Sequence, residues 1–101
     1  MAKYIINVTF CIENQYINEW KVWANNTFLP MMQTHYQAPR IMRVMAHMEE
    51  GVSNFSIQHE ANEFHDLTIW KHQLQAQMER LLAERFGQHI LSFTTFLEII
   101  Q

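Results

Sequence analysis

The sequence contains little cysteine, glycine and proline, and it has no long hydrophobic run. The single cysteine, Cys11, excludes a disulfide within the chain and is typical of a reducing compartment. With two glycines and two prolines there is no flexible linker, so we expect one domain over residues 1–101. No apolar run approaches the roughly 18 residues of a membrane span, and the opening residues lack the features of a signal peptide. We therefore expect a cytoplasmic protein with no membrane partner.

Positive charge is also scarce. Seven lysines and arginines stand against ten aspartates and glutamates, which gives a formal net charge of −3 with histidine neutral. The seven cations are scattered, whereas a protein that binds a phosphate backbone needs clustered cations. We therefore expect no nucleic-acid partner. Hydrophobic residues at 49% and charged residues at 17% are instead typical of a globular domain.

Two runs of alternating apolar and polar residues, IMRVMAHM and VSNFSIQHEA, predict a β-hairpin within residues 39–61. Gly51 lies between them, and glycine accepts the positive φ that a tight reversal needs. A short turn there would place Glu49 opposite Val52. In that register Met42, Val44 and Ala46 share a mostly apolar face with Phe55, Ile57 and His59, and Val44 lies opposite Ile57. The other face is mostly polar.

The rest of the chain predicts two further strands and two helices. They are a strand at 4–12, a helix at about 14–29 with a short piece to 35, a helix from a cap at Asn62 to Gly87, and a strand at 90–100. Pro30 should kink or restart the first helix. The order βαββαβ with right-handed crossovers predicts a ferredoxin-like α+β fold, in which two helices cover one face of a four-stranded antiparallel sheet of order 4-1-3-2.

The second face of this sheet is predicted to be bare, and we expect it to carry the function. Its predicted residues are Ile5, Asn7, Thr9, Cys11, Ile41, Arg43, Met45, His47, Asn54, Ser56, Gln58, Glu60, Ser92, Thr94, Phe96 and Glu98. The set is too apolar for an ordinary solvated face and too polar for a core under helices. This face has three possible interpretations. It is an ordinary solvated surface, it pairs with a second copy of the chain around a cavity, or it binds a different partner. Pairing with a second copy is favoured.

Several segments resemble a known family: EWKVWANNTFLP, RIMRVM, the turn EEG, and the ending ERFGxxILSFTTFLEII. Together they are similar to an uncharacterised bacterial family catalogued as a domain of unknown function, number 4286, over nearly the whole chain. That family is similar to the dimeric α+β barrel superfamily. The resemblance implies a homodimer whose two sheets pack face to face, with any ligand held in the barrel or between sheet and helices. It implies no activity.

The same superfamily contains cofactor-independent monooxygenases and haem-degrading enzymes. These use an asparagine on the first strand, a tryptophan and, for haem, a histidine on the second helix. Asn7 stands at a comparable strand position, but the third strand has Gln58 and Glu60 in place of a tryptophan, and the helix has Thr68 and Trp70 in place of the histidine. No cofactor is therefore expected. A cofactor-independent monooxygenase or isomerase stays an alternative, as does a structural interaction domain without a ligand.

Six histidines raise the hypothesis of a metal site, and their spacing argues against it. His65 and His72 are separated by about 10 Å of helix rise, which is too far to share one ion. His47 and His59 fall on opposite faces of the predicted hairpin. We therefore expect no metal.

The candidate ligand-binding residues are the polar groups of the bare face, namely Asn7, Arg43, Gln58, Glu60 and Glu98. In the predicted register Arg43 and Glu60 are diagonal neighbours. They would form a salt bridge or, alternatively, leave a positioned arginine that recognises a carboxylate or an enolate. The salt bridge is the simpler interpretation. We predict a small homodimeric domain that binds a small molecule on this face, with the ligand and any catalytic role undetermined by the sequence.

Overall fold

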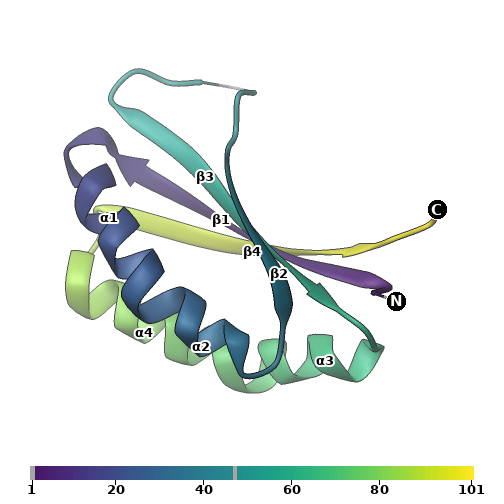
Figure 1. Cartoon of the computed structure of the whole chain (residues 1–101). Coiled ribbons are helices and arrows are strands. Elements are labelled where there is room, and N and C mark those ends of the chain that lie inside the picture. Colours follow the sequence, from purple (N-terminus) through teal and green to yellow (C-terminus); the bar gives the residue numbers. More distant parts are fainter. Residues whose placement is uncertain (1, 47) are drawn as a thin grey trace.

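The chain folds into a four-stranded antiparallel sheet with two helical arms on one face, as the computed structural model in Figure 1 shows. The structure describes residues 2–46 and 48–101. The strands are β1 (Tyr4–Glu13), β2 (Gln37–Arg43), β3 (Val52–Ala61) and β4 (Ile90–Glu98). Their spatial order is β2-β3-β1-β4. The predicted ferredoxin-like βαββαβ topology is confirmed.

The first helical arm joins β1 to β2, and the short piece that was predicted after residue 29 is helical to Gln33. It consists of a 3₁₀ turn (Asn14–Tyr16), α1 (Ile17–Trp23), a π-helical turn (Ala24–Phe28) and α2 (Leu29–Gln33). Pro30 lies at the start of α2, directly after the π-helical turn. A proline has no backbone N–H to donate, so the hydrogen-bonding pattern changes at this residue while the helix continues.

The second helical arm joins β3 to β4. It consists of α3 (Phe64–Ile69), a π-helical turn (Trp70–Leu74) and α4 (Gln75–Phe86). The cap is Glu63, one residue later than the predicted Asn62, and its backbone N–H donates to Asp66 Oδ2 at 3.1 Å. Gly87, with a φ of +60°, ends the arm as predicted.

The core lies between the sheet and the two arms. The helix-facing side chains of β1 are completely buried; they are Ile6, Val8, Phe10 and Ile12. The ring of Phe10 lies 5.2 Å from that of Trp20 and 5.6 Å from that of Phe28, measured between centroids. Trp20, Trp23 and Trp70 are all buried and belong to this core. The side chains of the sheet and of the two helical arms therefore fill the space on the helix-facing side of the sheet.

The hairpin reverses at the predicted turn. Gly51 has a φ of +83°, and Glu49 lies opposite Val52 as the sequence predicts. The strand that leads to this turn ends earlier than predicted, at Arg43. Val44 N–H still donates to the backbone carbonyl of Asn54 at 2.8 Å, and the next described pair is Glu49 with Val52. Between these two contacts this side of the hairpin, here called the loop, has more residues than the facing strand. His47, which the prediction placed on the uncovered face, lies outside the described residues.

The loop shifts the register of β2 against β3 by three residues. Ile41 lies opposite Ile57, where the prediction placed Val44. Side chains alternate along a strand, so an odd shift exchanges its two faces. Ile41 and Arg43 lie on the helix side as a result, and Arg40 takes a place on the uncovered face. The predicted position of Arg43 is therefore wrong.

The faces of β4 are also the reverse of the prediction. Ile90 is buried in the core, and Trp70 Nε1 donates to Thr94 Oγ1 at 3.2 Å, so the even-numbered side chains of β4 face the helices. The connection after Gly87 is short and fixes Ile90 as the first core residue of the strand. The residues that lie on the helix side, contrary to the prediction, are Ser92, Thr94, Phe96 and Glu98.

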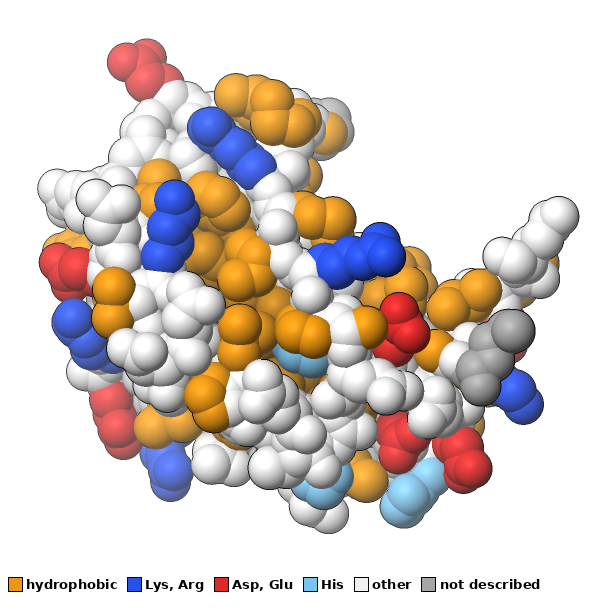
Figure 2. Space-filling view, viewed as in Figure 1, with side chains coloured by type: hydrophobic (Ala, Val, Ile, Leu, Met, Phe, Trp, Pro, Cys, Tyr) orange, Lys and Arg blue, Asp and Glu red, His pale blue; other side chains and the backbone are white. Residues whose placement is uncertain are grey.

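Strand β2 extends beyond the cover of the helices. All seven of its residues are exposed. Figure 2 shows hydrophobic side chains gathered in the hollow between the first helical arm and β2. The sheet thus has one edge that is covered on neither side within the described part of the chain.

Candidate functional site

The uncovered sheet face combines a polar centre with apolar margins. The register assigns to it Ile5, Asn7, Thr9 and Cys11 of β1, Gln37, Arg40 and Met42 of β2, Asn54, Ser56, Gln58 and Glu60 of β3, and Leu91, Phe93, Thr95 and Leu97 of β4. The two central strands contribute mostly amides, hydroxyls and a carboxylate. The outer strands contribute the exposed apolar side chains of Met42, Leu91, Phe93 and Leu97.

A row of hydrogen-bonded side chains crosses the centre of this face. Asn7 Nδ2 donates to Thr9 Oγ1 at 3.3 Å, and Thr9 Oγ1 lies 3.3 Å from Ser56 Oγ. Asn7 Oδ1 is buried and accepts no hydrogen bond from the described residues. A buried acceptor without a donor costs free energy, so this oxygen lowers the stability of the single chain.

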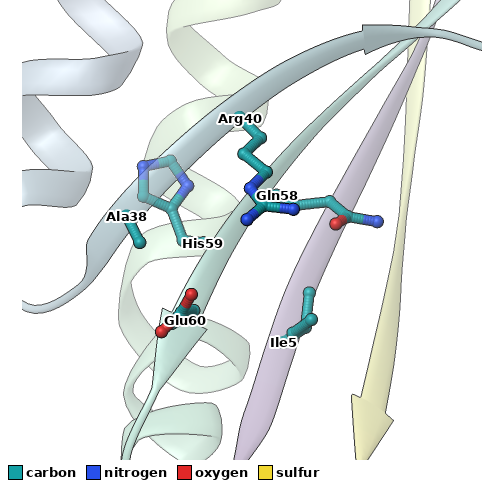
Figure 3. A pocket seen from close by; sticks show the side chains of 6 residues that line it. All are labelled: Ile5, Ala38, Arg40, Gln58, His59 and Glu60. Carbon is teal, nitrogen blue, oxygen red and sulfur yellow. The ribbon is translucent and has the colours of Figure 1, made fainter. Parts of the chain in front are cut away.

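A β-bulge at the start of β2 shapes a cavity at the edge of the same face. The register shifts between Gln37 and Arg40, and Ala38 has a φ of +54°. A cavity of about 60 Å³ opens beside the bulge; its lining residues are Ile5, Ala38, Arg40, Gln58, His59 and Glu60. Figure 3 shows the Arg40 side chain reaching from β2 over Gln58.

The two charges at this cavity do not form an ion pair with each other. The ion pairs within the described residues are Arg80–Glu84 and Arg85–Glu19, and His89 Nδ1 lies 3.0 Å from Glu13 Oε2. Neither Arg40 nor Glu60 takes part in one of them. A guanidinium presents a planar fork of donors that matches a carboxylate, so Arg40 is chemically able to bind an anion here.

His59 lies behind the cavity, on the helix side of β3. Its side chain is 1% exposed, and its ring lies 6.1 Å from that of Phe28 and 6.4 Å from that of Tyr36. Neither ring nitrogen has a hydrogen-bond partner in the described part of the chain. Burial disfavours the charged form and lowers the pKa of His59 to about 4. The imidazole is therefore neutral at physiological pH.

Tyr36 anchors the chain just before the bulge. Its hydroxyl donates to the backbone carbonyl of Asp66 at 2.7 Å, which joins the entry to β2 to helix α3. Burial, together with the negative charge of Asp66, raises the pKa of Tyr36 to about 12. The phenol therefore stays protonated and keeps this hydrogen bond. The bond to α3 holds the start of β2, and with it the bulge, in place on the helix side of the sheet.

The structure brings together three of the five predicted site residues. Asn7, Gln58 and Glu60 lie on the uncovered face. Arg43 lies on the helix side, where its guanidinium donates to Ser53 Oγ at 3.4 Å. Glu98 also lies on the helix side, opposite Tyr4 at the end of β4.

Arg40 is the site residue that sequence reasoning missed. Period-two alternation cannot locate a bulge, because the bulge interrupts the alternation. The available signal was Pro39, since a proline near a strand is found at edges and bulges. Its position one residue before Arg40 indicates where the regular pairing begins.

No trio of histidine, cysteine, aspartate or glutamate side chains with the geometry to hold a metal ion occurs within residues 2–46 and 48–101. The expected absence of a metal and of a cofactor stays a prediction. None of the helices in these ranges is both long enough and apolar enough to span a membrane.

The family model described as Domain of unknown function (DUF4286) matches residues 3–100. The chain belongs to this family. No curated protein matches the sequence. Among solved structures, a dimeric ferredoxin-like protein from an uncultured marine organism superposes with a TM-score of 0.53 and is 12% identical, covering 100% of this chain and 98% of that one. At this identity the likeness supports the ferredoxin-like fold alone.

Proposed function

We propose that this domain forms a homodimer through its uncovered sheet face and binds a small molecule between the two sheets, as a dimeric α+β barrel. The observation that supports this proposal is the arrangement of side chains on the uncovered face. Exposed apolar side chains on β2 and β4 flank a polar centre on β1 and β3. Leu91 and Phe93 expose 63% and 59% of their surface, and burying such a side chain contributes about 1.5–3 kcal/mol.

The polar centre supports a bound molecule in addition to a second chain. Asn7 Oδ1 has no donor among the described residues, and Arg40 takes part in no ion pair there. A second sheet that removed water from the Arg40 guanidinium without pairing it would lose several kcal/mol of binding free energy. A polar ligand enclosed by the two sheets would restore the hydrogen bonds of this group. The similar solved protein, which is described as dimeric, provides a precedent for pairing in this fold.

The dimer is tested by a charge placed on the proposed interface. In a two-fold interface each substitution occurs twice, so Phe93→Glu would bring two carboxylates to the apolar margin. We expect the wild type to be a dimer and Phe93→Glu a monomer by size-exclusion chromatography with light scattering. Phe64→Glu is the matched control, because Phe64 is similarly exposed at 65% but lies on α3, on the other side of the sheet. A monomeric wild type at high concentration would contradict the proposal.

The single thiol of Cys11, which is free and partly exposed on the same face, supports the cytoplasm as the proposed location. A free thiol persists where glutathione and thioredoxin keep cysteines reduced.

A further inference from the structure

We infer that the bulge cavity recognises a small carboxylic acid that carries a hydroxyl or ammonium group next to its carboxylate. Arg40 would bind the carboxylate, and Glu60 would accept a hydrogen bond from the neighbouring donor. The inference rests on the proposed function and specifies its ligand, because a second sheet would close the open side of this cavity.

The bulge is what directs Arg40 to this place. Pairing resumes at Arg40 opposite Gln58 after the interruption at Ala38, so Arg40 shares a face with Gln58 and Glu60. Arg43, three residues later, lies on the other side of the sheet and donates to Ser53. The strand therefore presents one arginine to each side, and only the first lines the cavity.

The charges at the cavity fit a ligand with an acceptor and a donor. The guanidinium of Arg40 engages no carboxylate of the described chain, and it offers parallel N–H groups to both oxygens of a carboxylate. Glu60 lines the same cavity and has only acceptors when ionised. Gln58 lies on β3 opposite Arg40 and two residues before Glu60, and it adds an amide that both donates and accepts (Figure 3). A purely anionic ligand would leave the Glu60 carboxylate facing another negative charge.

The size of the cavity limits what it can enclose. The centres of water-sized spheres can occupy about 60 Å³ of this cavity, and by that measure one water needs about 10–15 Å³, so the cavity has room for a few waters. It therefore holds a carboxylate and one substituent, against the apolar wall formed by Ile5. Any larger part of the ligand would extend over the polar row of Asn7, Thr9 and Ser56, where Asn7 Oδ1 lacks a donor.

The test measures binding of glycolate and acetate to the full chain by isothermal calorimetry, with thermal shift as a second readout. Glycolate has the neighbouring hydroxyl and acetate lacks it. We expect glycolate to bind about tenfold more tightly than acetate, because one hydrogen bond to a charged group is worth about that factor. Arg40→Gln should weaken glycolate binding about 10-fold to 100-fold, since it removes a charge-assisted pair.

Arg43→Gln is the matched control and should bind glycolate as the wild type does. Far-ultraviolet circular dichroism checks that each variant is folded, and light scattering reports the oligomeric state of the same samples. No glycolate binding by a dimeric wild type, or an equal loss in Arg43→Gln, would overturn the inference and leave the dimer standing. A monomeric wild type would overturn the proposed function itself.

Discussion

At the scale of single residues, His59 places a neutral imidazole in the core without a hydrogen-bond partner among the described residues. Each unpaired buried polar atom costs about 1–3 kcal/mol. We therefore expect His59→Leu, which has a similar volume and no polar atom, to raise the free energy of unfolding by about 1 kcal/mol at pH 7. Urea denaturation of the two proteins measures the difference. A large destabilisation by leucine would mean that the imidazole has a partner that stabilises it.

The same residue sets a pH dependence with a definite sign. The pKa of His59 is about 4 in the folded protein against 6.5 for an ordinary histidine, so the unfolded chain takes up the proton first as the pH falls. At a pH well above 6.5 the residue is neutral in both states and contributes no pH dependence. Between about pH 6.5 and pH 4 it should remove up to about 3 kcal/mol of stability. The difference in stability between wild type and His59→Leu, followed across this range, isolates that contribution from the carboxylates.

Thr94 gives a second prediction at this scale. Its hydroxyl accepts the only hydrogen bond that the structure assigns to the buried indole of Trp70. Thr94→Val keeps the shape of the side chain and leaves that N–H unpaired, so we expect a loss of about 1–3 kcal/mol. Thr95 is the neighbouring residue on the opposite, uncovered face, where valine adds apolar surface at the proposed dimer interface, so Thr95→Val should not lower the stability. Equal effects in thermal melts would contradict the assigned faces of β4.

At the scale of elements, the bulge of β2 holds an alanine in a backbone conformation that favours glycine. Ala38 has a φ of +54°, which costs an L-residue about 1–2 kcal/mol. Ala38→Gly should therefore stabilise the fold by up to about 1 kcal/mol. The same substitution at Ala76, an exposed residue of α4, should destabilise it by about 1 kcal/mol. Chemical denaturation of both variants checks for opposite signs.

Local patterns predicted β1, β3 and the turn because each depends on residues that are close in sequence. The alternation of β3 and the glycine at position 51 both agree with the structure. The register of β2 depends on how many residues loop out before the turn, and no periodic pattern reports that number. The faces of β4 depend on which part of an edge strand the second helical arm covers. The face of β4 with more apolar side chains is that of Leu91, Phe93 and Leu97, so the sequence pattern favours this face for the core. The short connection after Gly87 instead places Ile90 in the core.

At the scale of the whole molecule, connectivity was sufficient to predict the strand order and the covered face. The handedness of the two crossovers leaves few alternatives once the order βαββαβ is known. The sequence predicted which face of the sheet carries the candidate site, but it predicted only some of the residues on that face correctly. Asn7, Gln58 and Glu60 follow from the faces of the central strands, which the sequence gives reliably. The arginine was misplaced because it belongs to an edge strand whose pairing has an irregularity at each end.

That double irregularity has a practical consequence. Strand β2 is bounded by surplus residues on both sides, namely the bulge near Ala38 and the loop before the turn. Removing one residue from the bulge and adding one to the loop would shift this strand by one residue against β3 and leave the other strands unaltered. Such a change would turn Arg40 to the helix side and bring Arg43 to the open face, so protein engineers could move the positive charge along the edge of the sheet without changing the composition of the strand.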